Sequence, residues 1–444
     1  MIRLKQRFSL SHLGSYKHNK LIVLLLATGL KLLVSLLTPL SLDFIRLLYA
    51  STVILEKGGV AMVSPAEGGF CIFVLYALYK LWLFLSSEHL SLEQVIGAPE
   101  VSKQNYYFVP SYDSYLLILL MKLPIILFDC LAGLILYSFV KLLKKDDEKA
   151  MLVLCLWLFN PYALLLAEMK GTLDVIAAFF LLLSLYFYTK NKESVSAIFL
   201  ALGGGIKLWP LLAFPIFLID MIRRKGKLKA LAFAVLLITS FFFSISYRAF
   251  TPERRTLGDV FMTHLVDYEY FGLIFKKFHA QFNTTVFLLT IFLFLLYTSP
   301  KMHEKGKGLV DLILSEFLLI FVFSYWNSHY LLWVLPFLTL DFVLNPQRRK
   351  IIILLLATVL PMLLIVYGRC LFTYGHAFFY YPSDNNRILS KLSTALWNLP
   401  ENPIVKEARL VMILYSVFSA LCLIYSFSIL YRFVIKDNEN EHLV

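Results

Sequence analysis

Charged residues are scarce in this chain. Asp, Glu, Lys and Arg together make up 16% of its 444 residues, whereas 59% are hydrophobic and the mean hydropathy is +0.74. A soluble core cannot hide that much apolar surface, so the composition excludes a soluble globular protein and predicts a polytopic membrane protein. The net charge of +13 does not indicate nucleic-acid binding, because Lys and Arg cluster in short polar gaps between apolar runs.

Cysteine is scarce as well. The five cysteines form neither a disulfide framework nor the spacing of a metal site. The sequence has no internal repeat, low-complexity tract or soluble domain, so we expect a single transmembrane domain over residues 1–444. The basic N-terminal segment does not resemble a cleavable signal peptide, and we interpret it as a cytoplasmic lead-in to the first span.

Long apolar runs are what the sequence does contain. A membrane-spanning helix needs roughly 17–25 apolar residues, and about twelve segments fit. They lie near residues 21–38, 114–140, 150–167, 173–189, 194–206, 208–222, 228–247, 284–299, 309–325, 329–344, 350–367 and 409–431. A cytoplasmic N-terminus places the dense basic clusters at the inner ends of these runs, as the positive-inside rule requires. The predicted fold is an all-α polytopic membrane protein.

The long loops all fall on the non-cytoplasmic face under this topology. They are residues 39–113, 248–283 and 368–408, and they are rich in aromatic and acidic residues. The run 68–85 is apolar enough to span, but a crossing there would move the later basic clusters outside. We therefore interpret it as an interfacial or re-entrant helix within the loop 39–113. Since loops on a rigid scaffold carry sites, the working face is predicted to be non-cytoplasmic, in the plasma membrane or the endoplasmic reticulum.

Asp43 follows directly on the first span. Two interpretations stay open for it. In the first, Ser41 caps a short helix, the positive end of the helix dipole stabilises Asp43 in the first turn, and Asp43 pairs with Arg46. Alternatively, Asp43 is a general base at the membrane surface, beside a lipid-borne substrate.

A second candidate segment is FNPYALLLAEMKGTLDVIAAFF, residues 159–180. Asn160 interrupts a span, and Glu168, Lys170 and Asp174 crowd a tight hairpin. The hairpin is either an ordinary solvated turn with a Lys170–Asp174 ion pair or part of a site. Asp174 begins a strongly apolar helix, so we expect its carboxylate to reach the outer interface, and ionisable groups at such positions are functional candidates.

Two further segments carry polar residues at predicted outer ends. In ALGGGIKLWPLLAFP, residues 201–215, three glycines and a proline predict a broken helix, and Lys207 either snorkels or contacts a phosphate. In SYWNSHYLLWVLPFL, residues 324–338, an aromatic belt explains Trp326, Tyr330 and Trp333 but not His329. Arg369, at the outer end of the next span, adds another cation on this face.

Together these residues describe one site. Lys170, Lys207, His329 and Arg369 fall at the outer ends of spans, on the same side as Asp43. Several cations and one base at a single membrane surface suit an anionic lipid head group that undergoes displacement.

The motifs resemble the GT-C superfamily of integral membrane glycosyltransferases, and more closely its mannosyltransferases that use polyprenyl-phosphate mannose, including the one that adds the first mannose of GPI anchors. The resemblance spans most of the chain. Its matching residues are Asp43 in LDF, Asn160 and Pro161 followed by Lys170, Gly171 and Asp174, Lys207 to Pro210, and HYLLW at 329–333. The chain departs from the family where Ile45 replaces the second acid of a DxD pair and where FVPSYDSY, with Asp113, replaces a Pro-Tyr-Pro-Pro segment.

The resemblance implies transfer of a sugar from a polyprenyl-phosphate donor to a lipid-linked or glycan acceptor. Asp43 is then the base, Lys170, Lys207, His329, Tyr330 and Arg369 bind the donor phosphate, and Asp113, Asn160, Asp174 and Trp326 line the substrate cavity. No metal, soluble cofactor or nucleic acid is required. The alternative is a transporter or flippase of lipid-linked sugars, for which we expect an internal repeat and charges near the bilayer midplane. The sequence shows neither feature.

Overall fold

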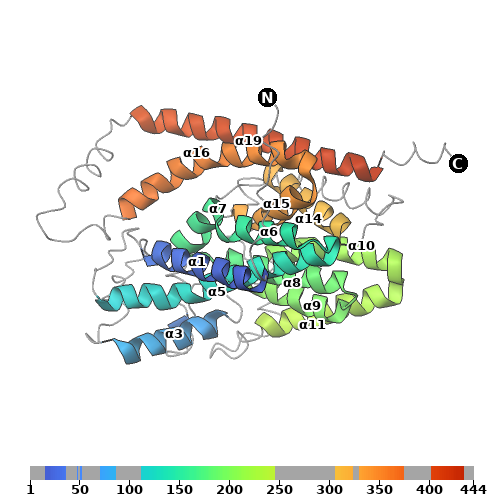
Figure 1. The fold of residues 1–444 in the computed structure, drawn as a ribbon, viewed down its shortest axis with the longest axis horizontal. Coiled ribbons are helices and arrows are strands. Elements are labelled where there is room, and N and C mark those ends of the chain that lie inside the picture. Colours follow the sequence, from blue (N-terminus) through green and yellow to red (C-terminus); the bar gives the residue numbers. More distant parts are fainter. Residues whose placement is uncertain are drawn as a thin grey trace, which may run out of the picture.

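The computed structural model describes residues 16–36, 48, 51–52, 71–86, 112–245, 306–323, 330–374 and 402–434. Helices make up nearly all of these residues, and no strand occurs among them (Figure 1). Within this part of the chain five helical segments are long and apolar enough to cross a membrane, namely Asn19–Leu36, Tyr115–Lys144, Asp147–Met169, Lys227–Ser244 and Ile413–Tyr431. The described part of the protein is therefore all-α, and its apolar helices indicate a membrane-embedded protein. The larger number of spans expected from the sequence stays a prediction.

The helices follow the apolar runs of the sequence. In chain order they are α1 (Tyr16–Leu36), α3 (Cys71–Leu85), α5 (Tyr112–Lys144), α6 (Asp147–Leu158), α7 (Pro161–Ala163), the π-helical turn η2 (Leu164–Met169), α8 (Asp174–Thr189), α9 (Glu193–Ile206), the 3-10 turn η3 (Trp209–Ala213), α10 (Phe214–Lys225), α11 (Lys227–Ile245), α14 (Lys307–Phe323), α15 (Leu331–Leu344), η6 (Pro346–Arg348), α16 (Arg349–Tyr374) and α19 (Asn402–Val434). Each predicted span coincides with one to three of these helices and turns, apart from 284–299, which lies outside the described residues.

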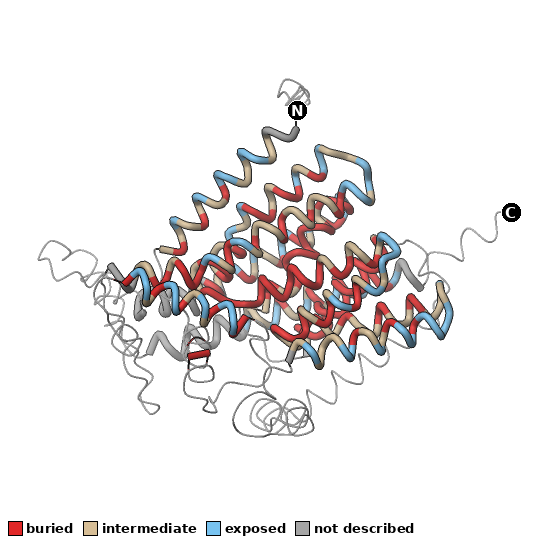
Figure 2. The backbone as a smooth tube through the Cα atoms, turned by 90° about the horizontal axis from the view of Figure 1, so that it is seen from below, coloured by how far each residue is buried: buried red, intermediate tan, exposed pale blue. Residues whose placement is uncertain are grey.

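Large apolar side chains remain exposed along the outer helix faces. Leu25 of α1, Leu228 and Phe243 of α11, and Phe84 of α3 are between 63% and 84% exposed. Figure 2 shows that buried residues are concentrated where helices meet, while exposed residues follow the outer turns. In a membrane such faces contact lipid, which is itself apolar, so they need no protein partner.

The run 68–85 forms α3, a helix of 15 residues. That length is below what a span ordinarily needs. The helix packs against α5 at the edge of the described part (Figure 1), with Leu75 and Trp82 buried and Phe73 and Leu81 exposed. The predicted helix is confirmed, and its interfacial position stays a prediction.

Two helices are interrupted, and local chemistry explains both breaks. After α6 the side chain of Asn160 accepts hydrogen bonds from the backbone N–H groups of Tyr162 and Ala163, and Pro161 occupies the first helical position, where its missing N–H does no harm. After α9 the residue Lys207 is extended, with φ −143° and ψ 140°, before η3 begins. The predicted break in 201–215 is therefore confirmed.

The α8–α9 hairpin determines which helix ends lie together. The two helices pack side by side after a short turn, so the beginning of α8 and the end of α9 meet at one end of the bundle. The 3-10 turn η3 and the helix α15 also contact α8. The hairpin thus brings residues 170–174, 207–213 and 330–333 to this end, which we call the Asp174 end.

Glycines in α9 allow this close packing. A Cβ atom built on Gly204 would lie 2.6 Å from Cγ of Leu211 in η3, and one built on Gly203 would lie 3.2 Å from Cβ of Phe180 in α8. A Cβ atom on Gly205 would overlap the Ser244 side chain of α11. The glycine run thus lets α9 approach three neighbours, as small residues do between membrane helices.

Replacing Gly205 by alanine is expected to lower the free energy of unfolding by about 1–3 kcal/mol, because the added methyl overpacks the contact with Ser244. Thermal unfolding of the detergent-purified protein measures the effect. Gly29→Ala is the matched control, since no atom lies within 4 Å of a Cβ at that position of α1. Equal unfolding temperatures for the two variants would contradict the tight α9–α11 contact.

Candidate functional site

Asp174 lies at the centre of the Asp174 end. It is the first residue of α8, where the helix dipole stabilises a negative charge. Its Oδ1 accepts hydrogen bonds from Nε1 of Trp209, at 3.1 Å, and from Nε1 of Trp333, at 2.8 Å. Its Oδ2 has no hydrogen-bond partner among the described residues, and the side chain is buried. A buried carboxylate is therefore held by two neutral N–H donors at the start of an apolar helix.

The sequence predicted that the Asp174 carboxylate reaches the outer interface. In the structure the residue is only 1% exposed, so that prediction is wrong. The hydrogen bonds that the structure gives to Asp174 come from the two indoles, and both go to the same carboxylate oxygen. The physical reason is that Trp209 and Trp333 cover the carboxylate and replace the water that it would otherwise bind.

The two indoles form a stack. The rings of Trp209 and Trp333 have centroids 5.2 Å apart and an interplanar angle of 12°, and the ring of Tyr330 lies 4.3 Å from that of Trp333. Phe317 of α14 meets Trp209 edge-on. A single carboxylate and an aromatic stack thus join the start of α8, the break after α9 and the start of α15.

Of the predicted cations, Lys170 lies close to Asp174 along the chain, and Lys207 lies close to its partner Trp209. Lys207 ends α9, is half-buried and stands two residues before Trp209. Lys170 ends η2 and is followed by Gly171, which has a φ of +70° that glycine adopts without strain. The backbone therefore turns sharply between Lys170 and Asp174, and both lysines belong to segments that meet at the Asp174 end.

For most of the other predicted site residues, the structure gives either no position or only a position within a helix. Asp43, Trp326 and His329 lie outside the described residues. Asp113 lies in the first turn of α5 and Arg369 near the C-terminal end of α16. Asn160, predicted to line the cavity, uses its side-chain oxygen to cap α7, so the structure gives it a local role in the helix break.

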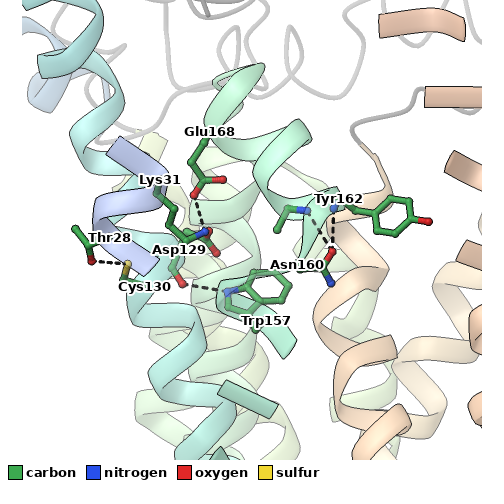
Figure 3. A network of polar contacts seen from close by, with 9 residues as sticks. Thr28, Lys31, Asp129, Cys130, Trp157, Asn160, Tyr162 and Glu168 are labelled. Atoms are coloured by element: carbon green, nitrogen blue, oxygen red, sulfur yellow. Dashed lines mark hydrogen bonds and ion pairs between the residues drawn. The ribbon is translucent and has the colours of Figure 1, made fainter. Parts of the chain in front are cut away.

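A buried ionic cluster was missed by the sequence analysis. Figure 3 shows Lys31 of α1 reaching toward Asp129 of α5 and Glu168 of η2. The Lys31 ammonium forms an ion pair with Asp129 and lies 2.8 Å from Oε1 of Glu168, and all three side chains are fully buried. One carboxylate oxygen on each acid has no hydrogen-bond partner in the described part of the chain.

A second lysine balances this charge. Lys122, also fully buried, donates hydrogen bonds from Nζ to the backbone oxygen of Ser35, at 3.1 Å, and of Met169, at 3.2 Å. Those carbonyls belong to the last turns of α1 and η2, the negative ends of the helix dipoles. The four ionisable groups therefore sum to zero formal charge and tie together three segments of the bundle.

The position of this cluster corrects one expectation. Asp129 lies in the middle of the candidate span Tyr115–Lys144, whereas we expected no charge near the midplane. The available signal was spacing: Lys122 and Asp129 are separated by two helical turns and share a face of α5. Charged groups inside candidate spans are rarely lipid-facing, so this spacing indicated a charged inner face of α5, although it did not indicate Lys31 as the partner.

At the opposite ends of α8 and α15, acidic side chains are bound by arginine and tyrosine side chains from neighbouring elements. Arg224 and the Tyr188 hydroxyl both bind the buried carboxylate of Asp220, each at 2.7 Å. Arg348 binds Asp311 at 2.7 Å and Asp341 at 3.0 Å. These contacts join α8 to α10 and α14 to α15 and η6.

Among the described residues, no group of three or more His, Cys, Asp or Glu side chains is arranged to hold a metal ion. Because Asp43 and His329 are outside that part of the chain, the expectation that no metal takes part stays a prediction.

No protein-family model matches the chain, and no curated protein is detectably similar to it.

Proposed function

We propose that the protein is a glycosyltransferase that moves a sugar, mannose in the first instance, from a polyprenyl-phosphate donor to a lipid-linked or glycan acceptor at the non-cytoplasmic membrane face. The observation that supports the proposal best is the contact of Asp174 with Trp209 and Trp333. This contact joins three of the four segments that resemble GT-C motifs, which are far apart in the sequence.

The proposed reaction is a direct displacement. Asp43 removes the proton of an acceptor hydroxyl, whose oxygen forms a bond to the anomeric carbon. The bond from that carbon to the phosphate oxygen breaks, and its electron pair leaves with polyprenyl phosphate. The configuration at the anomeric carbon inverts. The phosphate is bound by Lys170, Lys207, His329, Tyr330 and Arg369. The cations among these residues bind the phosphate more strongly as its negative charge grows during the reaction. The scheme therefore needs no general acid.

Asp174 has a positioning role in this scheme. By binding both indoles it holds the start of α15 against the segment that contains Lys207. Tyr330 lies on the same aromatic stack. Asp174 and Trp333 thus fix the spacing between two parts of the proposed phosphate site.

A transporter or flippase of lipid-linked sugars is the second candidate. It is favoured by the Lys31, Asp129 and Glu168 cluster, because buried charges within spans are typical of transport pathways. The enzyme is preferred for two reasons. Lys122 neutralises the charge of the cluster, and the GT-C-like segments meet at Asp174 and not at the cluster.

A donor panel separates the two candidates. Purified protein is incubated with an acceptor mixture and several polyprenyl-phosphate sugars, and released polyprenyl phosphate is measured. Release from one donor is the expected result. If no donor is consumed, yet the protein moves a lipid-linked sugar between the leaflets of liposomes, the transporter replaces the enzyme.

Lys207→Ala is expected to raise the apparent KM for the lipid donor about 10- to 100-fold, because a charge-assisted hydrogen bond contributes about 1.5–3 kcal/mol. Initial rates at varied donor concentration measure it. The matched control is Lys190→Ala, which removes an exposed lysine at the other end of α8. Unchanged kinetics in Lys207→Ala would make Lys207 a residue that only snorkels to the interface.

A further inference from the structure

The turn between α10 and α11 concentrates positive charge. In RRKGKLK, residues 223–229, five of the seven residues are basic and none is acidic. The two helices form a hairpin (Figure 1). Because α10 begins directly after η3 and leads away from it, the turn lies at the end of the bundle opposite the Asp174 end. We call residues 223–229 the basic turn.

Membrane topology alone does not explain the basic turn. The turn between α5 and α6, residues 141–149, holds four lysines but also three acids, and two of its lysines form ion pairs within it. The positive-inside rule counts Lys and Arg and gives acids little weight, so both turns satisfy it. The rule therefore leaves open why one turn is close to neutral while the other contains no acid at all.

The neighbouring hairpin neutralises only part of this charge. Arg224 lies 2.7 Å from the buried carboxylate of Asp220, one turn earlier in α10. Lys225 forms an ion pair with Glu193 at the start of α9 and donates to the side-chain oxygen of Asn191, at 3.3 Å. These contacts hold the basic turn against the turn between α8 and α9, so its position is fixed by side chains on both sides.

Lys227 and Lys229 keep their charges exposed. Both are in the first turn of α11, and neither forms an ion pair within the described part of the chain. The helix dipole disfavours cations at this end, and the first turn of α11 contains no acid. An anion from outside the protein would therefore be stabilised by both lysines.

The apolar neighbours of these lysines indicate where that anion lies. The candidate span Lys227–Ser244 begins at the basic turn, and Leu228 and Leu231 are 80% and 60% exposed. Leu231 follows Lys227 by one helical turn and so lies on the same face of α11. In a membrane these leucines contact acyl chains, which places the adjacent ammonium groups at the level of the lipid head groups.

We propose that the basic turn binds the head groups of anionic phospholipids in the leaflet opposite the Asp174 end. Phosphate accepts charge-assisted hydrogen bonds from lysine, and clusters of Lys and Arg next to a span are attracted to an anionic leaflet. A soluble acidic partner would not use the exposed leucines, whereas a phospholipid contacts both the lysines and the leucines. The proposal is independent of sugar transfer.

The test measures lipid binding to the detergent-purified, full-length protein by native mass spectrometry. Phosphatidylglycerol and phosphatidylcholine with matched chains are titrated separately, and the wild type is expected to bind phosphatidylglycerol more tightly. The double variant Lys227→Gln with Lys229→Gln is expected to raise the apparent Kd for phosphatidylglycerol about 25-fold, since each lysine near an anionic membrane surface accounts for about fivefold. Its affinity for phosphatidylcholine is expected to stay that of the wild type.

Two further variants distinguish a lipid site from surface charge and from misfolding. Lys144→Gln with Lys145→Gln removes two exposed lysines from the turn between α5 and α6 and is expected to leave the affinity unchanged. Lys227→Arg with Lys229→Arg keeps the charge and is expected to retain binding. Equal wild-type affinity for the two lipids, wild-type affinity in the Lys227 and Lys229 glutamine variant, or an equal loss in the Lys144 and Lys145 variant would each overturn the proposal. Full competition by soluble glycerol phosphate would also overturn it, because the membrane lipid would then not be required.

Discussion

Replacing Lys31 by methionine is expected to lower the free energy of unfolding by about 3–5 kcal/mol, the range observed when one partner of a buried ion pair is removed. The physical reason is that two fully buried carboxylates, Asp129 and Glu168, lose the ammonium that offsets their loss of water. Methionine fills a similar volume, so the effect reports charge rather than a cavity. The measurement is the unfolding midpoint of the purified protein, together with its yield in the membrane fraction.

Two further variants make this result interpretable. Lys149→Met removes the partner of Asp146 in a solvent-exposed ion pair and is expected to leave the unfolding midpoint unchanged within error. The double variant Lys31→Met with Glu168→Gln is expected to be more stable than Lys31→Met alone, because the net negative charge that the loss of Lys31 leaves in the cluster is then removed. A single variant as stable as the wild type would show that the cluster does not hold the bundle together.

Replacing Asp43 by asparagine is expected to reduce kcat for sugar transfer by about 10²- to 10⁴-fold, the usual contribution of a general base. Asparagine has nearly the same shape but cannot accept the acceptor's proton. Because Asp43 is proposed to act on the reaction and not on the fold, the unfolding midpoint is expected to remain that of the wild type. Initial rates with saturating donor measure the loss.

The matched control for Asp43 is Asp146→Asn. Asp146 caps α6 and accepts a hydrogen bond from the backbone N–H of Lys149, and asparagine caps helices equally well. This variant is expected to keep full activity. Wild-type kcat in Asp43→Asn would remove Asp43 from the mechanism, whereas a large drop in its unfolding midpoint would favour the alternative in which Asp43 supports a local helix.

The sequence predicts helical segments and their breaks better than it predicts the contacts between them. The break at 201–215 was predictable because glycine and proline act on their own backbone, and Lys207 is indeed extended there. The partners of Asp174 were not predictable, because Trp209 and Trp333 come from segments 35 and 159 residues away. Sequence reasoning assigned Trp333 to an aromatic belt, which describes its distance from the membrane surface and not its neighbours.

The buried cluster illustrates the same limit. In the sequence, each of the three paired residues is a single charge inside or beside an apolar run, namely Lys31, Asp129 and Glu168. A single charge in such a place predicts snorkelling or an interfacial position. Their mutual pairing depends on how α1, α5 and η2 are rotated about their axes. Helix rotation is set by packing over the whole length of each helix, so no local pattern encodes it.

Apolar run length and the placement of Lys and Arg were sufficient to determine that this chain is helical and lies in a membrane, because both follow from the transfer of single residues between water and lipid. The tertiary structure alone decided that Asp174 is covered by two indoles and that four charges are buried together. These features depend on contacts between distant helices, whose energies exist only once the helices have packed.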